Sequence, residues 1–148
     1  MVSKNIKIIF LISISIFITY VIILFSNYSE ISDVVNTHIN IKGEVDGQGS
    51  KKNLWIASLV NLLVLSLIGF LIKKPHLANY PVEITEKNKD NIYKKMQFFL
   101  GIIAIITSAS FAFMIFKATN LTDYYIYLIL FLILFPLVII YYFNKKNE

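Results

Sequence analysis

Four long apolar segments dominate the pattern of hydrophobic and polar positions along the chain. They cover residues 8–25, 54–72, 98–116 and 124–143, and none of them contains a charged residue. An α-helix of about 20 residues crosses the hydrocarbon core of a bilayer, whereas buried strands of a soluble sheet usually end after roughly 4 to 8 residues. The pattern therefore predicts four transmembrane helices.

Composition agrees with this prediction, because 57% of the residues are hydrophobic and only 16% are charged. The first segment is long for the core of a secretory signal, and no small-residue cleavage pattern follows it, so we expect it to remain as a helix. The outer loop 26–53 and the inner loop 73–97 are too short to form separate hydrophobic cores. We predict one all-α integral membrane domain over residues 1–148.

The lysines predict the orientation of these helices. Ten of them lie in the N-terminal tail, the 73–97 connection and the C-terminal tail, and only four lie on the opposite side. Basic residues are retained on the cytoplasmic side of short loops, so we expect a multi-pass protein of the cell membrane with both termini cytoplasmic. The net charge of +5 then reflects topology and anionic lipid rather than nucleic-acid binding.

The interior of the predicted bundle offers little chemistry. The spans contain no acid, lysine, arginine or histidine, which argues against a proton relay or an ion-coupled pump. Asn61 is the most polar residue deep in a span, and we expect it to hydrogen-bond to a neighbouring helix. In the third span, small residues predict close helix packing: Gly101, Ala104, Ser108 and Ala112.

The outer loop contains the residues that could bind a ligand. Asp46-Gly47 predicts a tight turn and Gly43 and Gly49 allow further changes of direction, so we expect a compact, hairpin-like cap. His38, Glu44 and Asp46 could together bind a divalent metal or move protons. Their spacing is not a known metal signature, and structural hydrogen bonding is the commoner role of such a histidine.

In the inner loop, Pro75 and Pro81 should end the second helix. Thr85 is a plausible N-cap for a helix over 86–97 that leads into the third span. We expect this amphipathic segment to lie along the cytoplasmic surface with its lysines toward lipid headgroups.

Two segments resemble a known family. "VVNTHINIKGEVDGQGSK" and "NYPVEITEKNKDNIY" are similar to the two recurrent stretches of the DUF1648 membrane-domain family, which forms the N-terminal half of the SdpI-type immunity proteins of bacteria. The chain departs from the family where Asn36 and Val45 replace prolines, and SdpI-type proteins carry further membrane helices. The matching positions in the outer loop are Thr37, His38, Asn40, Gly43, Asp46, Gly47, Gly49, Ser50 and Lys51.

The resemblance implies a membrane protein that recognises a peptide toxin or a membrane protein partner through the loop around His38. Candidate ligand-binding residues are His38, Asn40, Glu44 and Asp46. One alternative is a metal-dependent membrane enzyme that uses His38, Glu44 and Asp46, and another is an accessory subunit of a membrane complex. The sequence assigns no catalytic residue and requires no cofactor, although a divalent metal is compatible with it, and the absence of cysteine excludes thiolate chemistry.

Overall fold

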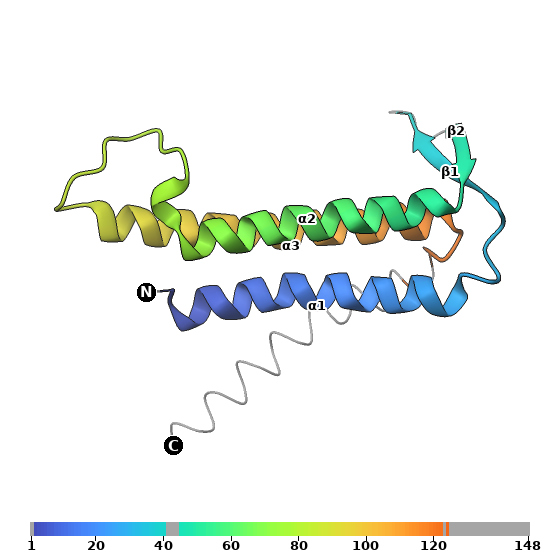
Figure 1. The fold of residues 1–148 in the computed structure, drawn as a ribbon, viewed down its shortest axis with the longest axis horizontal. Coiled ribbons are helices and arrows are strands. Elements are labelled where there is room, and N and C mark those ends of the chain that lie inside the picture. Colours follow the sequence, from blue (N-terminus) through green and yellow to red (C-terminus); the bar gives the residue numbers. More distant parts are fainter. Residues whose placement is uncertain (1, 41–44, 123, 125–148) are drawn as a thin grey trace, which may run out of the picture.

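Three long helices lie side by side and form the body of the molecule (Figure 1). The structure is a computed structural model that describes residues 2–40, 45–122 and 124. A two-stranded hairpin lies at one end of the helices, and the connection between α2 and α3 lies at the other (Figure 1). The elements in chain order are α1 (Lys4–Asn27), β1 (Val34–Ile39), β2 (Val45–Ser50), α2 (Lys52–Lys73), the short 3-10 helix η1 (Pro75–Leu77) and α3 (Lys89–Ala118).

Each long helix has the length and apolar composition needed to cross a membrane. Their 24, 22 and 30 residues correspond to helices about 36, 33 and 45 Å long. The predicted spans 8–25, 54–72 and 98–116 fall within them, so the three-helix part of the prediction agrees with the structure. The predicted fourth span, 124–143, lies outside the described residues apart from Tyr124.

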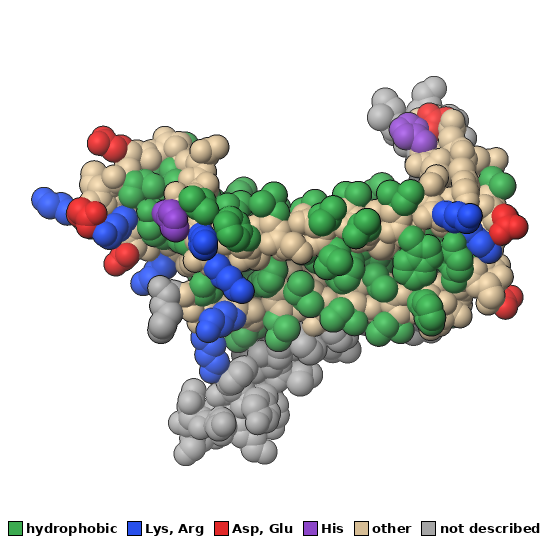
Figure 2. Space-filling view, in the orientation of Figure 1, with side chains coloured by type: hydrophobic (Ala, Val, Ile, Leu, Met, Phe, Trp, Pro, Cys, Tyr) green, Lys and Arg blue, Asp and Glu red, His purple; other side chains and the backbone are tan. Residues whose placement is uncertain are grey.

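The outward faces of the helices are apolar. Phe25 is 73% exposed, Leu63 60% and Met114 59%, and the visible face in Figure 2 is mostly hydrophobic along the helices, with charged side chains gathered toward the two ends. A soluble protein rarely exposes a continuous apolar surface of this extent. Such a surface is suited to contact with lipid acyl chains.

Helix α3 packs against both α1 and α2 along a face of small residues. Gly101, Ala104, Ser108 and Ala112 are all buried. A Cβ atom at Gly101 would lie 2.8 Å from Cγ2 of Ile9 on α1, so the absence of a side chain allows this close approach. Small residues permit such packing in membranes, where burial of apolar surface gives helices little tendency to associate.

Side-chain hydrogen bonds connect the helices. The Asn61 amide on α2 donates to the Tyr20 hydroxyl on α1 at 2.9 Å, which confirms that Asn61 bonds to a neighbouring helix. The Gln97 amide on α3 donates to the Ile72 carbonyl at 2.8 Å and thereby satisfies one of the free carbonyls at the end of α2. Among the described residues, Asn61 Oδ1 and Ser108 Oγ are buried without a partner.

The predicted helix over 86–97 that leads into the third span is present from Lys89 onward. Residues from Lys89 onward belong to one uninterrupted helix that continues to Ala118, because no glycine or proline between Lys89 and Gly101 would end or bend it. Thr85 is not the N-cap; its carbonyl accepts from the amides of Asn88 and Lys89 in a turn that precedes the helix.

The connection before α3 is folded through local contacts. The Tyr80 hydroxyl donates to the Pro75 carbonyl at 2.6 Å, and the Tyr80 ring lies 5.8 Å from that of Tyr93. Burial, and secondarily the nearby Tyr93, raise the pKa of the Tyr80 hydroxyl. The Asn88 side chain bonds to the Thr85 amide and the Glu83 carbonyl. These contacts fix the turn that reverses the chain from α2 into α3.

The close approach of α1 and α3 generates the first prediction. Replacing Gly101 by leucine should destabilise the bundle by about 1–3 kcal/mol, as overpacking of a tight contact does, because Ile9 occupies the space beside it. Thermal unfolding of the detergent-purified protein, followed by circular dichroism, measures the effect. Ser110→Leu is the matched control, since Ser110 lies on the exposed side of the same helix; equal melting temperatures would contradict the prediction.

Candidate functional site

Strands β1 and β2 form a hairpin at one end of the bundle (Figure 1). Val34 pairs with Ser50 and Val35 with Gly49 in an antiparallel register. This agrees with the expected hairpin-like cap, but the expected turn is wrong: Asp46 and Gly47 lie inside β2. The strands are instead joined through residues 40–44.

The register explains where the glycines are needed. Two irregularities flank His38, which pairs with Gly47, and such bulges change the direction of a side chain. A Cβ atom at Gly47 would lie 2.9 Å from Cβ of His38, and one at Gly49 would lie equally close to Thr37 Cγ2. The glycines therefore serve the close approach of the two strands rather than a turn between them.

His38 and Asp46 are brought together by this irregular pairing. His38 Nδ1 contacts Asp46 Oδ1, across the hairpin. The pair lies in solvent, since the side chains are 70% and 44% exposed. The carboxylate can hold one imidazole tautomer with Nε2 available to another group, the arrangement used both in ligand recognition and in metal binding.

The other candidate residues contribute less to this site. Asn40 directly follows β1, and Glu44, the third member of the expected metal set, lies outside the described residues. Within residues 2–40 and 45–122, no three histidine or acidic side chains gather as a metal site would require. The small-residue face of Gly101, Ala104, Ser108 and Ala112 is part of the helix packing.

Lys51 attaches the hairpin to the bundle. Its ammonium group donates to the Ile31 carbonyl at 3.0 Å and forms an ion pair with Asp33 at 3.0 Å, and it lies 5.0 Å from the centre of the Tyr28 ring. Its amide also donates to the Asp33 carbonyl. With only 19% of the Lys51 side chain exposed, the hydrogen bonds are partly protected from water and hold the segment before β1 against the start of α2.

Contacts between aromatic rings near Lys51 also connect α1 to α2. Trp55 on α2 lies 5.5 Å from the Tyr28 ring and 6.5 Å from the Phe25 ring. Tyr28 is thus placed between a cation and an indole. Such edge and tilted contacts between aromatic rings add roughly 0.5–1.5 kcal/mol beyond their buried area, and they connect the end of α1 to α2.

Cavities lie between the hairpin and the ends of the helices. One of about 280 Å³ is lined by the α1–β1 segment and the end of α3, including Glu30, Asn36 and Asn120. A smaller one of about 150 Å³ lies among Asn36, Asn53 and residues of α2 and α3. Asn36 lines both cavities, so amide groups are available directly below the strand that carries His38.

Sequence reasoning identified His38 and Asp46 but not the arrangement that positions them. The sequence singles out Lys51 only through the family resemblance, because a lysine at the edge of a span ordinarily faces water. Its proximity to Tyr28 and Ile31 depends on how the chain folds back after α1, which has no periodic signal. Asn36 and Asn53 are common surface residues, and nothing local distinguishes them.

Comparisons with known protein families, with curated proteins and with solved structures find no match to this chain.

The attachment through Lys51 generates the second prediction. Lys51→Met should keep the helices intact and increase hydrogen exchange in residues 28–38, because the bonds to Ile31 and Asp33 are lost; the local opening free energy should fall by about 1–2 kcal/mol. Lys52→Met is the control, since the neighbouring Lys52 side chain is exposed. Equal exchange in both variants would show that Lys51 does not hold this segment.

Proposed function

We propose that this chain is a bacterial multi-pass membrane protein that recognises a membrane-active peptide through the hairpin around His38 and so protects the cell from it. The observation that carries the proposal is the His38–Asp46 pair, held in a defined position yet exposed to solvent. An ion pair this exposed adds little to folding stability. Its placement on an anchored hairpin therefore suits binding better than structural support.

The form of the hairpin supports a peptide as the ligand. In the part of the chain that the structure describes, the sheet has two strands, so each strand has an outer edge that can pair with a further extended chain. Addition of a strand to a sheet edge is a common way to bind peptides: backbone hydrogen bonds supply affinity, and side chains beside the edge supply specificity. His38 and Asp46 are the side chains that would supply this specificity.

The resemblance to the SdpI-type N-terminal domain supports immunity as the purpose of this binding. The positions that carry the resemblance include His38, Gly47, Gly49 and Lys51. In the structure, His38 pairs with Asp46, another matching position, the two glycines allow the close strand approach, and Lys51 holds the segment before β1 against the start of α2. Residues of the family-like pattern therefore act together in one local arrangement.

The topology in this proposal has the hairpin outside the cell and both termini in the cytoplasm. Eight lysines accompany the start of α1, the end of α2 and the region that begins α3, all at the end of the helices away from the hairpin. Three described lysines, Lys51, Lys52 and Lys117, lie at the hairpin end. The positive-inside bias thus favours a cytoplasmic location for the end without the hairpin.

Cysteine labelling tests this topology, because the natural chain has no cysteine. We expect a membrane-impermeant maleimide to label Gln48→Cys in intact cells, and to label Asn79→Cys only after permeabilisation. Both native side chains are exposed, so access in permeabilised cells should be equal. The opposite pattern would reverse the orientation and place the hairpin in the cytoplasm.

Protection of cells tests the proposed function. A sensitive bacterial strain that expresses the chain should survive a higher concentration of a membrane-active peptide from a panel of purified bacteriocins, and His38→Ala or Asp46→Asn should reduce this protection roughly tenfold or more, as loss of a central binding residue does. His76→Ala is the matched control, since His76 is also exposed but belongs to η1 at the other end. Unchanged protection in His38→Ala, at equal protein level in the membrane, would refute the role of the pair.

The metal content of the purified wild type and of purified His38→Ala distinguishes peptide recognition from metal chemistry. We expect elemental mass spectrometry to find the same metal content in the wild type and in His38→Ala. A stoichiometric divalent metal that is lost in the variant would instead make the hairpin a coordination site and favour the metal-dependent enzyme.

A further inference from the structure

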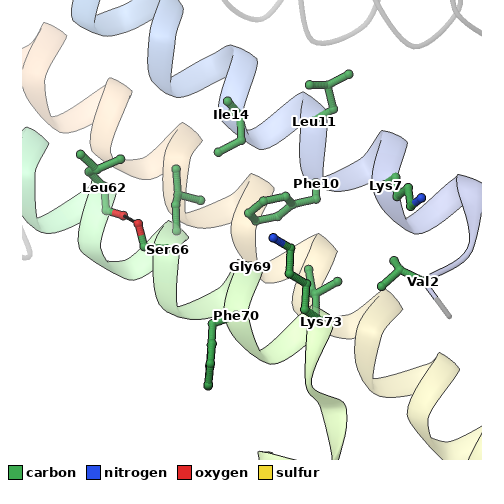
Figure 3. Close-up of a pocket in the computed structure, with 12 residues that line it drawn as sticks. Val2, Lys7, Phe10, Leu11, Ile14, Leu62, Ser66, Gly69, Phe70 and Lys73 are labelled. Carbon is green, nitrogen blue, oxygen red and sulfur yellow. Dashed lines mark hydrogen bonds between the residues drawn. The ribbon is translucent and has the colours of Figure 1, made fainter.

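A groove between α1 and α2, far from the hairpin, has the features of a lipid site. It encloses about 610 Å³, within the range of roughly 300–1,000 Å³ typical of small-molecule sites. Phe10 and Ile14 of α1 lie on one side, and Leu62 and Phe70 of α2 lie on the other (Figure 3). Leu62 is 42% exposed and Phe70 44%, so the groove is open from the side, where acyl chains surround the helices.

Gly69 shapes the groove. A Cβ atom at this position would lie 2.9 Å from the Phe10 ring, so the ring occupies the space that a side chain would take. Figure 3 shows Phe10 directed from α1 toward α2 at this level. The Phe10 ring therefore forms the base of the groove at this level, and aliphatic side chains such as Ile14 and Leu62 line it nearby. Such a surface suits a flexible hydrocarbon chain.

Two lysines supply a charge at one end of the groove. Lys7 on α1 and Lys73 on α2 both line it, and they lie toward the same end, with Val2 between the helices (Figure 3). Within the described residues neither lysine forms an ion pair, since the three pairs present join other side chains. An anion at this end of the groove would be attracted by both lysines.

The position of Lys7 strengthens this reading. It lies near the start of α1, whose first turn contains no acidic residue, and a helix start carries partial positive charge that disfavours a cation. The positive charge of Lys73 is favourable at the end of α2, where the helix dipole is negative. Lys7 has no such compensation within α1. An anionic group beside Lys7 would offset the repulsion.

We propose that this groove binds an anionic phospholipid, with an acyl chain along Phe10 and Gly69 and the headgroup beside Lys7 and Lys73. The alternative occupant is the predicted span 124–143 of the chain itself. That span is followed by Lys145 and Lys146, which would add positive charge instead of neutralising Lys7 and Lys73. Charge complementarity therefore favours the lipid.

Native mass spectrometry of the full chain in mild detergent tests this proposal, with phosphatidylglycerol and phosphatidylethanolamine of identical acyl chains as probes. We expect the wild type to retain phosphatidylglycerol preferentially, and Lys7→Gln/Lys73→Gln to reduce that preference roughly thirtyfold, from about 1 kcal/mol for each of the two lysines near a lipid surface. The control is Lys52→Gln/Lys117→Gln, with the same loss of charge at the hairpin end, which should retain the preference.

A second variant examines the apolar part of the site. Ser66→Trp places a large side chain at a residue that lines the groove and should reduce retention of both lipids. Equal retention of the two lipids by the wild type, or an equal effect of the two double variants, would overturn the proposal. Efficient disulfide formation between Ser66→Cys and Leu130→Cys would also overturn it, because the groove would then hold residues of the 124–143 segment.

Discussion

The narrow contact between α1 and α3 is the constraint on which the rest of the structure depends. In a bilayer, apolar side chains gain little by leaving lipid for one another, so helices associate through close packing and a few polar bonds. Here Gly101 lets Ile9 approach α3, while Ala104, Ser108 and Ala112 continue the same buried face. With α3 in contact with both partners, α1 and α2 need little direct contact over their full length. They are connected by the Asn61–Tyr20 hydrogen bond near the middle of the helices and by Tyr28, Lys51 and Trp55 at the hairpin end, and their separation at the other end leaves the groove.

The helices could be predicted from the sequence because lipid imposes a simple rule on them. A span must satisfy its backbone internally and keep charges near its ends, so residues 8–25, 54–72 and 98–116 are visible as apolar runs. The inner loop is shorter than its predicted range of 73–97 for a related reason: the charges of residues 89–95 place them outside the apolar run, whereas backbone hydrogen bonding continues α3 through them. Polarity marks where a helix leaves the membrane and says little about where it bends.

The hairpin shows what local signals cannot specify. Asp46-Gly47 has the chemistry of a tight turn, yet both residues lie in β2, because the two irregularities beside His38 shift the pairing and Gly47 is needed opposite the histidine. The candidate pair His38 and Asp46 could be selected by residue type, but the contact between them depends on that shift. The role of Lys51 depends on carbonyl groups twenty or more residues earlier in the chain, a relation that periodicity and turn propensity do not encode.

The aromatic contacts of Trp55 have a practical consequence. It is the only tryptophan in the 148 residues, and it lies against Tyr28, the ring that also contacts Lys51. Any change in how the hairpin is seated alters the polarity and packing around this single indole. Its intrinsic emission is therefore a native optical reporter of the hairpin, readable in lipid without a label, while the groove between α1 and α2 lies at the far end of the helices and leaves that signal undisturbed.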